Sequence, residues 1–122
     1  MLRRVSVLLV DDDEDTHALL ACVLERAGYS VETAGNGREA LTLLDQIRPS
    51  VILLDIEMPV MNGAEFRQRQ RQDRDLIRIP TIVMTGSRME AMLDPAVENV
   101  LRKPFTTPKL LAAVAPYCTP AS

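Results

Sequence analysis

Residues 51–63, VILLDIEMPVMNG, decide how this chain folds. The first four are apolar, which is typical of a strand buried on both faces of a parallel sheet. The run places one acid, Asp55, at its end, and Pro59 and Gly63 then turn the chain. Because burial of an unpaired carboxylate is costly, we expect a cation and hydrogen-bond donors to meet Asp55.

Polar residues follow three other strand-like runs in the same way. Asp11 and Asp12 follow residues 5–10, Thr85 follows residues 81–84, and Lys103 follows residues 99–102. The carboxyl ends of parallel strands lie at one edge of a sheet, where open α/β proteins bind their ligands. We therefore expect these side chains to lie together with Asp55.

This set of residues resembles the receiver domain of bacterial two-component response regulators, in particular the chemotaxis regulator. The resemblance covers nearly the whole chain and rests on motifs that occur in the family's order. These motifs are Asp11-Asp12, Asp55 followed by Met58-Pro59 and Gly63, Thr85-Gly86, and Lys103-Pro104-Phe105.

Helical periodicity alternates with the apolar runs. Apolar stripes predict a first helix that includes residues 20–27 and ends at Gly28, and a second helix that includes residues 40–47 and ends before Pro49. We expect strands at 5–10, 29–34, 51–54, 81–84 and 99–102. The last helix is expected to begin with Thr107 as N-cap and Pro108 as its first residue, and to end before Pro116.

Alternation of strands and helices predicts right-handed βαβ units with helices on both faces of a parallel sheet. We expect one domain over residues 1–122, with a flavodoxin-like, doubly wound α/β fold of five strands and five helices. The strand order 2-1-3-4-5 is implied by the resemblance.

Composition limits the other classes of function. The chain has 122 residues, with 17 acidic and 14 basic side chains and a net charge of -3. This balance gives no reason to expect nucleic acid or an anionic membrane as a partner. No apolar run approaches the roughly 20 residues of a membrane span, and the N-terminus does not read as a signal peptide, so we expect a cytoplasmic protein.

Clustered acids at the strand ends indicate a magnesium site, because Mg²⁺ prefers a few carboxylates, water and phosphate oxygens. Beside such an ion Asp55 is a plausible nucleophile toward phosphorus, forming an aspartyl phosphate. Lys103 and the hydroxyl of Thr85 are expected to bind the phosphoryl oxygens, since phosphoryl transfer depends mainly on positioning and charge neutralisation.

The resemblance adds particular roles. It implies that Asp11, Asp12, Asp55 and the main-chain carbonyl of Glu57 bind Mg²⁺, and that the Lys103-Pro104 peptide bond is cis. It also implies a phosphohistidine donor on a sensor histidine kinase or histidine phosphotransfer protein, and a downstream protein target. The receiver then catalyses only its own phosphorylation and dephosphorylation, as a monomer or weak dimer.

Two features depart from the family pattern. Val100 stands where the family usually has Tyr or Phe, and a valine cannot respond to a movement of Thr85 as an aromatic ring does. Thr85 and Val100 are thus the expected switch positions. The segment between Thr85 and Lys103 is also short and contains Pro95, so the fourth helix, over residues 88–93, is expected to be short or irregular.

The third helix carries arginines at helical spacing. Arg67, Arg71 and Arg74 fall at i, i+4 and i+7, which predicts one basic face. That face is either a solvated helix surface or a docking site for an acidic partner or a second protomer.

Two other classes of function stay open from the sequence. A degenerate receiver would keep the fold as a phosphorylation-independent interaction module. A flavodoxin-like or phosphohydrolase enzyme would share the architecture, but the chain lacks a glycine-rich phosphate loop. For the individual residues, the alternatives are helix capping by Asp11 or Asp12 and a surface position for Lys103.

Overall fold

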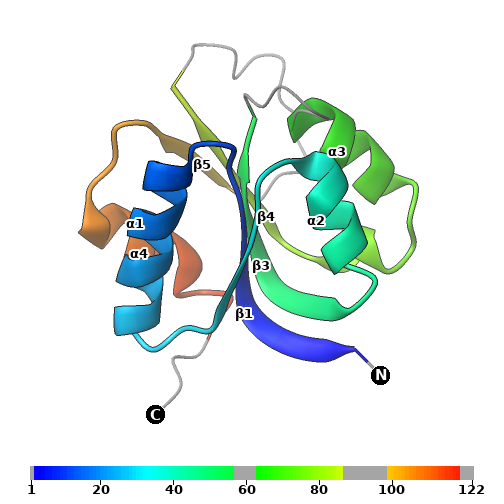
Figure 1. The fold of residues 1–122 in the computed structure, drawn as a ribbon, viewed down its shortest axis with the longest axis horizontal. Helices are drawn as coiled ribbons and strands as arrows, with labels where there is room; N and C mark the ends of the chain where they lie inside the picture. Colours follow the sequence, from blue (N-terminus) through cyan, green and yellow to red (C-terminus); the bar gives the residue numbers. More distant parts are fainter. Residues whose placement is uncertain (1, 57–62, 87–98, 119–122) are drawn as a thin grey trace.

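The computed structural model describes residues 2–56, 63–86 and 99–118. Five parallel strands form one sheet in the order β2-β1-β3-β4-β5, which confirms the predicted fold class (Figure 1). The strands are β1 (Arg3–Val10), β2 (Val31–Ala34), β3 (Ile47–Asp55), β4 (Thr81–Thr85) and β5 (Asn99–Arg102).

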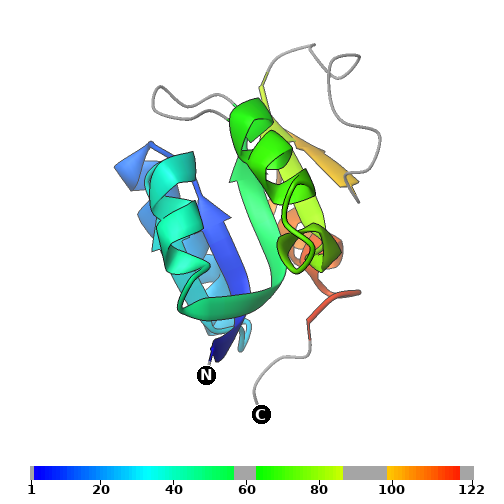
Figure 2. The same cartoon turned by 90° about the vertical axis from the view of Figure 1, so that its right-hand side faces the viewer.

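Helices cover both faces of the sheet (Figures 1 and 2). On one face lie α1 (Glu14–Arg26) and α4 (Thr107–Val114), and on the other lie α2 (Gly37–Leu43) and α3 (Gly63–Arg71). A short 3-10 helix, η1 (Leu76–Arg78), connects α3 to β4. The fourth helix expected over residues 88–93 lies outside the described residues, so α4 corresponds to the predicted fifth helix.

Two neighbouring inner strands, β1 and β3, hold the two layers together. Residues 7–10 of β1 and 51–54 of β3 are completely buried, as expected for parallel strands covered on both sides. Leu9 and Leu53 pack with α1 and α4, whereas Leu8 and Leu54 pack with α2 and α3. Each buried leucine contributes about 2 kcal/mol, so these strands fix the carboxyl edge of the sheet firmly.

The boundary between α2 and β3 differs from the prediction. Helix α2 ends at Leu43, and Ile47 begins β3 instead of continuing the helical stripe. Pro49 lies inside the strand, opposite Val5 of β1. Proline is tolerated there because β4 pairs with β3 only from Ile52 onwards, so the other side of Pro49 needs no ladder hydrogen bond.

Local backbone conformation and a capping side chain set two of the helix ends. Gly28 ends α1 with φ of 99°, a conformation that favours glycine. The N-cap of α4 is Thr106 and not the predicted Thr107, since the Thr106 hydroxyl accepts a hydrogen bond from the backbone N–H of Lys109 at 3.3 Å. Pro108 therefore lies one position further into the helix. The helix ends before Pro116, as predicted.

The predicted basic face of α3 is wrong in two respects. Arg67 is only 4% exposed, and its Nη1 donates to Oε1 of the buried Gln70 at 2.7 Å. Helix α3 ends at Arg71, so Arg74 does not continue its surface. The i, i+4, i+7 spacing assumed a longer helix whose arginines all faced solvent.

Gln70 replaces the apolar stripe that the sequence of α3 lacks. Its side-chain nitrogen donates to the carbonyl oxygens of Leu76 and Ile79 at 2.9 and 3.2 Å, and lies 3.1 Å from the hydroxyl oxygen of Thr81. This buried amide therefore connects α3 to η1 and to the start of β4. A buried group with satisfied hydrogen bonds can hold elements together where hydrophobic contacts are few.

We predict that Gln70→Leu lowers the free energy of unfolding by about 3 kcal/mol, because the carbonyl oxygens of Leu76 and Ile79 and Nη1 of Arg67 each lose a buried hydrogen bond. Gln72→Leu, at an exposed position near the end of the same helix, should change it by less than about 0.5 kcal/mol. Urea denaturation of both variants measures the difference. Equal stability of the two variants would contradict the structural role of Gln70.

In the part of the chain that the structure describes, the helices are too short and too polar for any of them to cross a bilayer.

Candidate functional site: an acidic pocket at the carboxyl edge of the sheet

Strand register brings the predicted site residues to one edge. Val10 pairs with Leu54, so Asp11 and Asp55 follow neighbouring positions of β1 and β3. Asp55 pairs with Met84, and Thr85 pairs with Arg102, which precedes Lys103. The chain leaves β1 toward β2 on one side and returns to β3 on the other. The acids therefore lie at the topological switch point of the sheet.

Lys103 is the cation that meets the two buried acids. Its Nζ lies 3.4 Å from Oδ2 of Asp55 and 3.6 Å from Oδ2 of Asp11. The Asp11 side chain is completely buried and that of Asp55 is 5% exposed, while the lysine side chain is 32% exposed. One ammonium thus lies between two carboxylates in a poorly solvated place, where the charges attract and repel strongly.

The backbone holds Lys103 in this position. Its N–H donates to the carbonyl oxygen of Thr85 at 2.8 Å, which extends the pairing of β4 and β5 beyond the end of β5. The following Lys103-Pro104 peptide bond is cis, as the resemblance implied. Thr85 itself is buried, at 1% exposure, directly beside the strand that carries Asp55.

Carboxylate oxygens of Asp11, Asp12 and Asp55 lie within 4.8 Å of one another. Oδ2 of Asp11 is buried and accepts no hydrogen bond within the described residues. One lysine carries a single positive charge against three carboxylates. The residues therefore fit a hard divalent cation, because such an ion takes oxygen ligands and would satisfy the free Oδ2. Glu57, expected to contribute its carbonyl, lies outside the described residues.

Asp13, and not Asp11 or Asp12, is the N-cap of α1. Its side chain accepts hydrogen bonds from the hydroxyl of Thr16 and from the backbone N–H groups of Thr16 and Asp15. These hydrogen bonds lower the pKa of the Asp13 carboxyl below its usual value. The sequence contained this signal, since Asp13 and Thr16 stand three residues apart at the start of a helix. Because Asp13 caps the helix, Asp11 and Asp12 are not needed as caps, and their carboxylates belong to the acidic cluster with Asp55.

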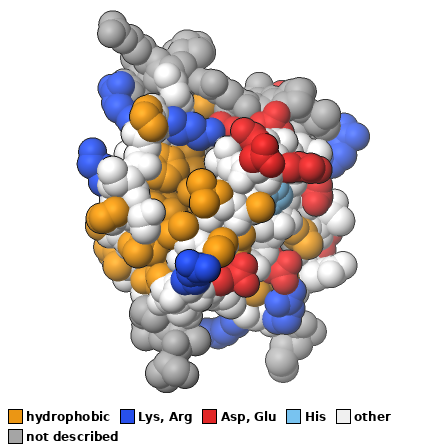
Figure 3. Space-filling model, turned by 60° about the vertical axis from the view of Figure 1, so that its left-hand side comes forward, with side chains coloured by type: hydrophobic (Ala, Val, Ile, Leu, Met, Phe, Trp, Pro, Cys, Tyr) orange, Lys and Arg blue, Asp and Glu red, His pale blue; other side chains and the backbone are white. Residues whose placement is uncertain are grey.

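On the face drawn in Figure 3, a group of acidic side chains lies toward the upper right, beside a broad hydrophobic area, and a smaller acidic group lies lower down. The exposed acids at the start of α1 are residues 12–15, which follow directly on the buried Asp11. A cation approaching the pocket would therefore meet a negative surface potential.

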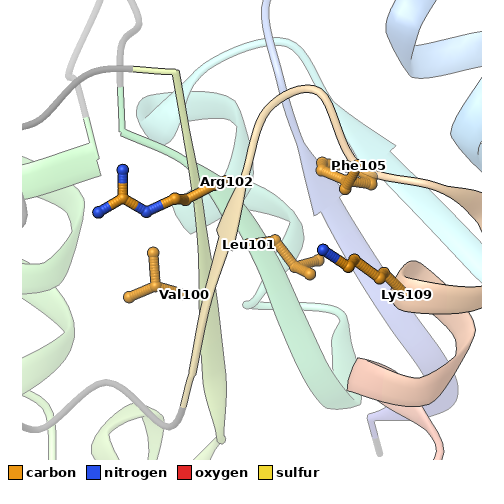
Figure 4. A pocket seen from close by; sticks show the side chains of 5 residues that line it. All are labelled: Val100, Leu101, Arg102, Phe105 and Lys109. Atoms are coloured by element: carbon orange, nitrogen blue, oxygen red, sulfur yellow. The ribbon is translucent and has the colours of Figure 1, made fainter.

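The two expected switch positions lie on the same face of the sheet edge. Val100 pairs with Val83, and Thr85 is two residues further along β4, so their side chains point to the same side. Val100 is half-buried, whereas Thr85 is buried. Val100 also lines a hollow of about 420 Å³ beside β5. Its other lining residues are Leu101, Arg102, Phe105 and Lys109 (Figure 4).

A doubly wound sheet of order 2-1-3-4-5, with three acids and a lysine at its carboxyl edge, defines an α/β protein of the flavodoxin-like class with an acidic site. Comparison with known proteins narrows this class. The family model of the response regulator receiver domain matches residues 7–115. The chain therefore belongs to the response regulator receiver domain family, the signalling module of two-component systems.

Individual relatives agree with this assignment. Response regulator MprA of Mycolicibacterium vanbaalenii is 39% identical over 112 residues, which are 88% of this chain and 48% of that protein. The chain thus spans about half the length of such curated relatives. The chemotaxis protein CheY4 of Vibrio cholerae has a TM-score of 0.84 at 33% identity, and the match covers 97% of this chain and 100% of that one.

The response regulator TrrA of Thermotoga maritima, solved in complex with Mg²⁺ and BeF, has a TM-score of 0.83 at 28% identity. The match covers 96% of this chain and 100% of that one. That structure therefore holds its Mg²⁺ within a fold that matches nearly all of this chain.

We predict that Lys103→Met lowers the free energy of unfolding by about 2 kcal/mol in metal-free buffer, because two buried carboxylates then repel without a cation between them. Adding Asp11→Asn to this variant should recover part of the loss, since it removes one of the two charges. Lys109→Met, at an exposed position of α4, should have little effect. Unchanged stability of Lys103→Met would contradict this electrostatic account.

Proposed function

We propose that this receiver accepts a phosphoryl group on Asp55 from a phosphohistidine donor, in a reaction that requires Mg²⁺, and that the modification switches its protein contacts. The observation that carries the proposal is the position of Lys103 Nζ, 3.4 Å from Oδ2 of Asp55 at the edge of a three-carboxylate cluster. An isolated structural ion pair would not need the further acids.

The ligands proposed for Mg²⁺ are carboxylate oxygens of Asp11, Asp12 and Asp55, together with the main-chain carbonyl of Glu57 by position in the family motif. The bound ion would supply positive charge to the phosphoryl oxygens and offset the repulsion among the acids. The Mg²⁺ complex of TrrA supports this assignment for a related receiver.

In the proposed step, an Oδ atom of Asp55 forms a bond to phosphorus while the bond between phosphorus and the histidine nitrogen of the donor breaks. The electron pair of that bond stays on the imidazole, which takes up a proton from solvent. Lys103 and the Thr85 hydroxyl bind the phosphoryl oxygens while the phosphorus atom is transferred to Asp55. Little other chemistry is required of the protein, because positioning and charge neutralisation dominate phosphoryl transfer.

Return to the starting state needs only water. Attack of water on phosphorus breaks the bond to Asp55, releases inorganic phosphate and restores the carboxylate. The same side chains stabilise the charge on the phosphoryl oxygens in both reactions. In both, the reacting group of the receiver is its own Asp55 side chain.

The proposed partners are a sensor histidine kinase or histidine phosphotransfer protein as donor, and a downstream protein as target. The proposal that Thr85 reports the phosphoryl group is supported by its buried position at the end of β4, the strand that pairs with the end of β3. Val100 would transmit a smaller displacement than an aromatic ring. We therefore propose that the output depends more on the contacts that Thr85 and Lys103 make with the phosphoryl group than on a side-chain rotation at position 100.

Incubation with acetyl phosphate and Mg²⁺ is expected to add the mass of one phosphoryl group to the intact protein. Asp55→Asn or a chelator should abolish the addition, and Lys103→Met should slow it by about 100-fold, because a charge that stabilises the transferring oxygens is lost. Asp45→Asn, at an exposed acid in the turn between α2 and β3, is the matched control and should be phosphorylated normally.

Intact-protein mass spectrometry over a time course measures these outcomes. Absence of added mass with acetyl phosphate and with a phosphorylated histidine donor would contradict the proposal. It would favour the alternative of a phosphorylation-independent interaction module.

A further inference from the structure

The two carboxylate oxygens of Asp11 have different surroundings. Oδ1 accepts a hydrogen bond from the backbone N–H of Asp13 at 3.0 Å. Oδ2 accepts none within the described residues and lies 3.6 Å from Nζ of Lys103. One oxygen is thus held by the chain itself, and the other is left facing the acidic pocket.

The backbone of Asp11 is also fixed on its other side. Its N–H donates to the carbonyl oxygen of Ala34, the last residue of β2, at 3.1 Å. The main chain at Asp11 therefore cannot shift easily, and the orientation of its carboxylate depends on the direction of the N–H at Asp13. A short aspartate side chain bonded two residues ahead forms a local turn that fixes its rotamer.

The direction of that N–H is set by the side chain of Asp13. Its Oδ1 accepts from the backbone N–H groups of Asp15 at 3.1 Å and Thr16 at 3.5 Å, and its Oδ2 accepts from the Thr16 hydroxyl at 3.0 Å. Asp13 is thereby tied to the first turn of α1, a helix whose Leu20 and Leu24 are buried in the core. Helix α1, anchored in the core, is therefore connected to the carboxylate of Asp11 by the cap hydrogen bonds of Asp13 and by the hydrogen bond from the N–H of Asp13 to Oδ1 of Asp11.

We propose that Asp13 and Thr16 are positioning residues that hold Oδ2 of Asp11 toward the divalent cation of the acidic pocket. This inference rests on the proposed function, since it concerns the same metal site. Asp13 is not itself a ligand in this account, because both of its oxygens are used by the cap. The acidic cluster accordingly consists of Asp11, Asp12 and Asp55.

Position and charge make different predictions for variants of Asp13. Asp13→Asn removes the negative charge but keeps an oxygen for the backbone N–H groups, and its amide can donate to the Thr16 hydroxyl oxygen. Asp13→Ala removes the charge and the cap together. Similarly, Thr16→Ser keeps the hydroxyl that contacts Asp13, whereas Thr16→Val removes it.

Asp73 provides a matched control. Its Oδ1 accepts from the backbone N–H groups of Asp75 and Leu76, two and three residues ahead, at 2.9 and 3.0 Å. It therefore makes the same two backbone contacts as Asp13 and carries the same charge. It lies before η1, at the end of the sheet opposite the pocket.

Calorimetric titration with Mg²⁺ tests the proposal. Asp13→Ala should raise the dissociation constant about 10-fold, a typical effect of losing a group that orients a metal ligand. Asp13→Asn, Thr16→Ser and Asp73→Ala should stay within about 2-fold of the unchanged protein, while Thr16→Val should weaken binding. In metal-free protein, NMR-detected exchange of the amide hydrogen of residue 13 should accelerate about 10-fold in Asp13→Ala and stay unchanged in Asp73→Ala.

The outcomes separate the inference from the function on which it rests. If the unchanged protein binds Mg²⁺ and Asp13→Ala binds it equally well, positioning by Asp13 is wrong although the metal site is right. Equal weakening in Asp13→Asn and Asp13→Ala would also overturn the inference, because charge and not geometry would then be responsible. If the unchanged protein binds no Mg²⁺, the proposed function fails and the inference fails with it.

Discussion

The burial of two carboxylates beside a single lysine is the constraint on which the site depends. Asp11 follows β1 and Asp55 ends β3, which are neighbouring inner strands of the sheet, and both acids are almost fully removed from water. Two such charges are stable at this depth only with a cation near both, and Lys103 supplies one. The charges of Asp11 and Asp55 already exceed the single charge of Lys103, and Asp12 adds a third carboxylate, so the excess negative charge makes the pocket suited to a further cation.

The rest of the fold serves this arrangement by fixing the carboxyl edge of the sheet. The completely buried segments of β1 and β3 allow little movement of the residues that follow them, since cores are packed at the density of organic crystals. At the opposite end, the buried Gln70 holds α3, η1 and β4 together through hydrogen bonds. A polar contact there compensates for a helix that has almost no apolar face beyond Phe66.

Much of the fold and of the site's composition could be predicted from the sequence, because the signals were local. Four strand-like runs, each followed by a polar residue, are enough to predict Asp11, Asp55, Thr85 and Lys103 at one edge. The family motifs fixed the strand order. Register confirms that they share this edge, whereas the catalytic roles assigned to them stay predictions.

The errors occurred where tertiary contacts override local patterns. The sequence pattern predicts Pro49 as a helix breaker, yet it fits inside β3 because one side of the strand is unpaired at that point. The spacing of the arginines predicts a basic face, solvated or used for docking, yet Arg67 is buried against Gln70. Neither outcome can be deduced from spacing alone, since each depends on which neighbouring element covers the residue.

The most direct test of the account is a crystal structure determined with Mg²⁺ and beryllium fluoride, a mimic of the phosphoryl group. We expect one ion bound by oxygens of Asp11, Asp12 and Asp55 at about 2.1 Å. The beryllium fluoride should be joined to Asp55, with Lys103 and Thr85 in contact with its fluorine atoms. A pocket without metal under these conditions, with Lys103 still placed between the two carboxylates, would contradict the claim that this acidic cluster exists to bind a divalent ion for phosphoryl transfer.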